Sequence, residues 1–72
     1  MNLFELQLGQ TCLIDEILID GSMRRRLLDL GITPKTKVTK VRTAPFGDPI
    51  ELSVRGYSLT MRLADALLVE VI

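Results

Sequence analysis

The feature that most constrains this sequence is a run of alternating apolar and polar residues between positions 50 and 63. The alternation holds over 50–54 and again over 57–63, with its phase shifted once across Arg55-Gly56. A period of two predicts β-strands with one buried face. A two-residue hairpin loop explains the shift, because the residues that flank such a loop pair on the same face. The predicted pairs are Val54 with Tyr57, Leu52 with Leu59, and Ile50 with Met61. The turn type stays open, since a type I′ turn would require positive φ at Arg55 as well as Gly56.

Four other segments complete the predicted order β, α, β, β, β, β. Residues 10–18 and 36–43 are predicted strands, and 67–72 is a last strand that follows a short turn over 63–66. Residues 22–30 are the one predicted helix. In the strand 36–43, Val38 and Val41 differ in parity, which predicts a bulge or a strong bend.

The helix has a predicted start, an apolar stripe and a predicted end. Its stripe is made of Met23, Leu27 and Leu30, at helical spacing. Asp20 or Ser22 is expected to cap its first turn. Gly31 suits the left-handed residue that ends a helix, with Ile32 packing back on Leu27 and Pro34 preventing continuation.

Five short strands with one apolar face cannot remain an open sheet with bare edges. We therefore predict a mainly β protein, a small SH3-like five-stranded barrel with one short α-helix that covers one opening. Length allows a single domain, 1–72. The core is expected to be aliphatic, since aromatic residues make up only 4% of the chain.

Charge and residue types exclude several classes of function. Nine basic residues balance nine acidic ones, so the net charge is 0 and nucleic-acid binding is not expected. A neutral surface leaves self-association open. Without histidine, and with serines that lack a base, the chain is not expected to be an enzyme, and so small a barrel is expected to leave no substrate pocket. The absence of a signal sequence or a long apolar run predicts a cytoplasmic protein that meets a membrane only through a partner.

A metal site is not predicted from the residues alone. Cys12, Asp15 and Glu16 are the obvious candidates, but Cys12 and Asp15 lie on opposite faces of a strand. A buried strand cysteine also behaves as a small apolar residue. Weak carboxylate binding, or a site shared between copies, stays open.

Three segments together resemble the FeoA family. Residues 26–34 (RLLDLGITP) are similar to the family's helix and its stop, 44–50 (APFGDPI) to its loop, and 54–62 (VRGYSLTMR) to its hairpin. Lys35 departs from the pattern, which often has glycine there. The resemblance implies an SH3-like fold and a role beside FeoB, the membrane ferrous iron transporter with a GTP-binding domain. It also implies two alternatives: a regulatory module linked to a DtxR-like metal-dependent repressor, or direct binding of a transition metal such as Fe²⁺ or Zn²⁺.

Four residues are predicted to contact a partner. Phe46 and Asp48 lie in the loop 44–49, which is either a rigid connector or a preformed recognition loop, since Pro45, Gly47 and Pro49 restrict its shape. Leu28 and Arg25 lie on the helix outside its apolar stripe. The basic face 24–26 is either solvated or in contact with an acidic partner surface or lipid phosphate.

Overall fold

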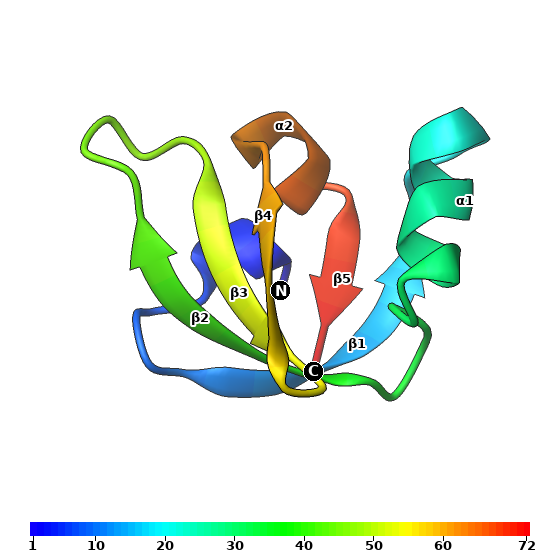
Figure 1. Cartoon of the computed structure of the whole chain (residues 1–72), viewed down its shortest axis with the longest axis horizontal. Helices are drawn as coiled ribbons and strands as arrows, with labels where there is room; N and C mark the ends of the chain where they lie inside the picture. The colour runs from blue at the N-terminus through cyan, green and yellow to red at the C-terminus, as the bar shows by residue number, and fades with distance from the viewer.

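The computed structural model describes residues 1–72 and consists of one five-stranded antiparallel sheet, two α-helices and a 3₁₀ helix (Figure 1). In the sheet the strands follow the order β4-β3-β2-β1-β5. The elements in chain order are η1 (Leu3–Glu5), β1 (Thr11–Ile17), α1 (Gly21–Asp29), β2 (Lys37–Thr43), β3 (Ile50–Val54), β4 (Tyr57–Met61), α2 (Leu63–Ala66) and β5 (Val69–Val71). The predicted mainly β, SH3-like class is confirmed. The turn expected over 63–66 is the short helix α2.

The hairpin of β3 and β4 has the predicted register. All three predicted pairs are present, Val54 with Tyr57, Leu52 with Leu59, and Ile50 with Met61. Arg55 and Gly56 have φ of 49° and 86°, so both central residues of the turn are left-handed and the turn has the type I′ sign pattern. This twist matches the right-handed twist of the two strands and sets their pairing.

Two register shifts bend the sheet. One lies between Ile14 and Glu16, where β1 pairs with β5, and it explains the imperfect alternation of β1. The other lies between Lys40 and Arg42, where β2 pairs with β3, so the predicted bulge is confirmed. Its proposed cause was wrong, because Val41 is 43% exposed and Lys40 is the buried residue.

The helix α1 ends as predicted but begins differently. The Ile32 amide donates to the Leu27 carbonyl at 2.9 Å, and the Gly31 amide donates to the Leu28 carbonyl at 3.0 Å, which is the Schellman pattern. Leu27 and Ile32 are both buried in the core. Asp20 is the N-cap residue by position, but its side chain makes no capping hydrogen bond.

The position of α1 also differs from the prediction. Figure 1 shows α2, not α1, over the opening between β4 and β5, whereas α1 stands at the outside of the sheet. Ala66 of α2 is fully buried, so this four-residue helix closes the core. The longer helix buries only Leu27 completely, with Met23 and Leu30 packed partly against the core. The core itself is aliphatic, as expected, since none of its buried apolar residues is aromatic.

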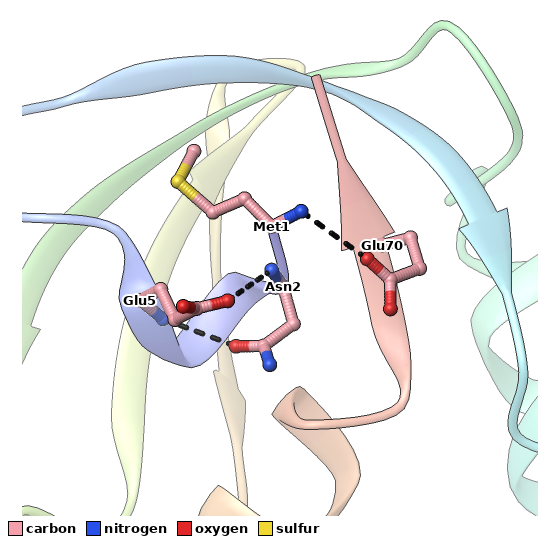
Figure 2. Close-up of polar contacts among 4 residues, drawn as sticks. All are labelled: Met1, Asn2, Glu5 and Glu70. Atoms are coloured by element: carbon pink, nitrogen blue, oxygen red, sulfur yellow. Dashed lines mark hydrogen bonds and ion pairs between the residues drawn. The ribbon is translucent and has the colours of Figure 1, made fainter.

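The first residues cover the outer edge of β5. The Val71 amide donates to the Met1 carbonyl at 2.7 Å, and Asn2 forms a β-bridge with Glu70. Figure 2 shows the capping box that follows: the Asn2 side chain accepts from the Glu5 amide at 3.1 Å, and the Glu5 carboxylate accepts from the Asn2 amide at 2.9 Å. The Met1 amino group lies 3.4 Å from the Glu70 carboxylate. The sheet therefore has one covered edge, at β5. The other edge, at β4, stays open because β4 pairs with β3 alone, so the expectation that closure would leave no bare edge was wrong.

Candidate partner-binding surface

The loop 44–49 is held at its base and presents an aromatic side chain at its tip. The Ala44 amide donates to the Pro49 carbonyl at 3.0 Å, and the Gly47 amide donates to the Ala44 carbonyl at 2.7 Å. Between these bonds, Phe46 is 99% exposed. A phenyl ring without any packing has no role in the core, so Phe46 is available for a contact with another molecule.

Asp48 joins the same loop to the short helix α2. Its carboxylate accepts a hydrogen bond from the amide of Leu63, the first residue of α2, at 3.0 Å. Arg62, the N-cap residue, makes no capping bond of its own. Asp48 therefore supplies the acceptor that the first turn of α2 otherwise lacks. The residue predicted to contact a partner thus also has a role inside the molecule.

Leu28 and Arg25 both lie on the exposed side of α1. Leu28 is 39% exposed and Arg25 is also exposed. The three neighbouring arginines, treated as one basic face in the sequence, have different surroundings. Arg24 donates to the Ile17 carbonyl and so connects α1 to β1. Arg26 lines a cavity, whereas the side chain of Arg25 makes no hydrogen bond or ion pair within the chain.

The structure does not bring the four predicted contact residues together. Figure 1 shows the loop between β2 and β3 at one end of the long axis and α1 at the other. Phe46 and Asp48 therefore belong to one end of the molecule, and Leu28 and Arg25 to the other. A single small contact cannot include all four.

Sequence reasoning missed a surface cavity of about 520 Å³ beside α1. The small size of the barrel was expected to leave no pocket, and this cavity departs from that expectation. Its lining residues come from α1, the residue before β3, the end of β4, and α2 with its N-cap residue: Met23, Arg26, Pro49, Thr60, Met61, Arg62 and Asp65. No local motif joins these positions, so only the folded chain reveals them.

Sequence reasoning also missed the buried Lys40. Its ammonium donates to the carbonyls of Leu6, at 2.9 Å, and Phe4, at 3.2 Å. It also lies 5.6 Å from the centre of the Phe4 ring, within the range of a cation–π contact. Lys40 shares its parity with Val38, which is the one signal that could have placed it on the inner face. It secures the segment around η1 against β2.

No three side chains of aspartate, glutamate and cysteine cluster closely enough to hold a metal ion. Neither helix of the chain has the length and apolar character needed to cross a membrane.

The family model described as FeoA domain matches residues 1–71. A fusion of Fe(2+) transport protein A with the Fe(2+) transporter FeoB, from Porphyromonas gingivalis, is 32% identical over 71 residues, which are 99% of this chain and 8% of the fusion protein. The chain therefore spans a small part of that relative.

Two solved structures are similar over nearly the whole chain. The FeoA protein of Chlorobium tepidum is 39% identical with a TM-score of 0.94, over 99% of this chain and 68% of that one. The zinc-complexed FeoA of Stenotrophomonas maltophilia, described as a prokaryotic SH3 domain protein, is 26% identical with a TM-score of 0.87. That match covers 100% of this chain and 89% of the other.

Proposed function

This chain belongs to the FeoA domain family, and on that basis we propose that it acts in ferrous iron uptake as a non-enzymatic cytoplasmic adaptor. Its partner is the cytosolic part of a FeoB-type transporter, including the GTP-binding domain. The protein reaches the membrane through that partner.

The fusion protein of Porphyromonas gingivalis supports this proposal. There, a segment similar to this chain is joined to a FeoB transporter in one polypeptide. Fusion holds two modules at a high effective concentration, which favours a contact that is weak between separate chains.

The observation that carries the proposal is Phe46. Its ring is 99% exposed, on a loop whose base is closed by backbone hydrogen bonds and which Asp48 connects to α2. An aromatic side chain on an ordered loop loses little conformational entropy when it binds, and buried aromatic residues dominate many interfaces. We therefore assign the main contact to Phe46, with Leu28 and Arg25 as a second contact at the other end of the molecule.

An adaptor of this kind changes transport only if it binds one conformation of the transporter more tightly than another. The chain contributes no nucleotide-binding loop of its own, so any guanine nucleotide is bound by the partner. The adaptor then shifts the population of transporter states and takes no part in the chemistry.

The test is a titration of the purified transporter cytosolic domain with the wild-type chain and two variants. Phe46→Ala is expected to weaken binding by about 30-fold, the effect typical of an interface hot spot. Leu8→Ala is the matched control, because Leu8 is also an exposed apolar residue, at 64%, in the segment before β1. Its affinity is expected to equal that of the wild type.

The same titration separates the two ends of the molecule. If Leu28→Ala lowers the affinity as much as Phe46→Ala does, the partner contacts both ends of the molecule. Equal affinity of wild type and Phe46→Ala would exclude the loop as the contact. No binding of the wild type at about 100 μM, a concentration above the Kd of most specific complexes, would exclude the adaptor role.

A further inference from the structure

The outer edge of β4 is bare. β4 pairs with β3 alone, whereas the far edge of the sheet, at β5, is covered by the first residues. Val54 and Tyr57 flank the two-residue turn and exchange both backbone hydrogen bonds, so every second residue of β4 after Tyr57 faces β3. Ser58 and Thr60 consequently direct their amides and carbonyls away from the sheet.

These outward groups have no partner in the chain. No backbone hydrogen bond outside the sheet ladder includes Ser58 or Thr60, and no side chain bonds to them. Both residues are exposed. Each contributes one donor and one acceptor, spaced as the next strand of a sheet requires. The chemistry that fits such an edge is an extended peptide backbone.

α1 lies on the far side of this edge and forms a groove with it. At one end, the Tyr57 hydroxyl donates to the Leu30 carbonyl and closes the gap between β4 and α1. At the other end, Thr60 and Met61 of β4 and Met23 and Arg26 of α1 line the cavity of about 520 Å³. That volume lies within the range of sites that bind small ligands.

The charges in the groove favour an acidic occupant. Arg26 and Arg62 line it, against the single carboxylate of Asp65. Neither arginine forms an ion pair, since the two ion pairs of the molecule are Met1 with Glu70 and Arg42 with Glu51. A planar guanidinium binds a carboxylate with two parallel hydrogen bonds.

We propose that the groove between β4 and α1 binds an extended acidic segment of a partner protein. The segment adds a strand to β4 through Ser58 and Thr60, and its carboxylate side chains bind Arg26 and Arg62. Phe46 and Leu28 do not line this groove. The proposal therefore stands apart from the adaptor contact described above, and either can fail without the other.

The first test uses two capped heptapeptides, one alternating valine with glutamate and one alternating valine with lysine. They are titrated into the ¹⁵N-labelled full chain, and the amide signals are followed by NMR. The glutamate peptide is expected to shift the signals of Ser58, Thr60 and Arg26 in a saturable way and to slow hydrogen exchange at Ser58 and Thr60. The lysine peptide is expected to bind at least about tenfold more weakly, as like charges meet in the groove.

A pair of variants tests the backbone contact. Thr60→Pro removes an outward amide without touching the bonds between β3 and β4, which is why an edge strand tolerates proline there. This variant is expected to bind the glutamate peptide about tenfold more weakly, because one backbone hydrogen bond is lost and the proline ring blocks the approach of the peptide. Thr60→Val keeps the amide and is expected to bind within about twofold of the wild type.

Several results would overturn the proposal. Equal binding of the two peptides would show that charge does not contribute to binding. Equal binding of the glutamate peptide by Thr60→Pro and Thr60→Val would show that the peptide does not pair with the edge of β4. The absence of saturable shifts up to about 2 mM peptide would exclude the site. If the wild type alone forms a dimer that Thr60→Pro abolishes, the edge is occupied by a second copy and the acidic segment is rejected. Should Thr60→Pro fail to fold, the comparison of the two peptides on the wild type still decides.

Discussion

The hydroxyl of Tyr57 donates a hydrogen bond to the carbonyl oxygen of Leu30, across the space between β4 and α1. Leu30 is the C-cap residue of α1, where carbonyls have no partner within the helix. The bond therefore satisfies an unpaired acceptor and fixes the end of the helix beside the hairpin. α1 buries only one side chain completely, so this contact adds to the few that hold it in place, among them the bond from Arg24 to the Ile17 carbonyl.

Replacing Tyr57 by phenylalanine removes this bond and keeps the ring. We expect the free energy of unfolding to fall by about 0.5–1.5 kcal/mol, the usual net value of one hydrogen bond. Urea denaturation followed by circular dichroism measures it. Ser58→Ala, at an exposed neighbouring position without a bond, should stay within about 0.5 kcal/mol of the wild type. Identical stability of Tyr57→Phe and wild type would mean that the bond contributes nothing.

Lys40 is the second target. Lys40→Met keeps the apolar stem but leaves the carbonyls of Phe4 and Leu6 without their donor. The expected loss is about 1–3 kcal/mol, the cost of unsatisfied buried acceptors. Lys37→Met, on the exposed side of the same strand, is the matched control and should have little effect. If both variants unfold at the same denaturant concentration, the buried ammonium is not stabilising.

Lys35 occupies a left-handed conformation, with φ of 74°. A non-glycine residue there costs about 1–2 kcal/mol, against about 0.5–1 kcal/mol for the extra entropy of an unfolded glycine. Lys35→Gly is therefore expected to raise stability by about 0.5–1 kcal/mol. Lys37→Gly, inside β2, should lower it, because glycine weakens a strand. Thermal unfolding of both variants measures these changes in stability. A loss of stability in Lys35→Gly would show that the left-handed conformation of Lys35 carries no net strain.

Asp48 connects the loop 44–49 to α2. Asp48→Ala removes the acceptor of the Leu63 amide and should cost about 0.5–2 kcal/mol, as the loss of a helix cap does. Asp48→Asn retains an acceptor oxygen, so it should lose less stability than Asp48→Ala. Hydrogen exchange at Leu63 measures the effect locally, with faster exchange expected only in the alanine variant. Unchanged exchange in both variants would mean that water replaces the carboxylate.

Local patterns in the sequence predicted the hairpin and the end of the helix well. The register of β3 and β4 follows from alternation and one glycine-containing turn, which are properties of adjacent residues. The stop at Gly31 depends on residues within one helical turn. Both features are set by interactions between residues that are close in the sequence, so a short stretch of sequence is enough to predict each of them.

Features that depend on distant segments could not be predicted in the same way. Lys40 is buried because the carbonyls of Phe4 and Leu6 are brought to it from more than thirty positions away. The groove beside α1 combines side chains from α1, β4, α2 and the loop before β3. The capping box of Asn2 and Glu5 was visible in principle, since asparagine followed three residues later by glutamate is a start signal, but its 3₁₀ helix is too short to produce a periodic pattern.

The cover that residues 1–2 place over β5 has a consequence for how copies of this protein can associate. Growth of a fibril by strand pairing needs two free borders on every subunit, one to receive and one to offer. This fold keeps only the border at β4, so a pair of molecules joined there has no further place for a third to attach. Any chain of subunits built through this sheet therefore terminates at two.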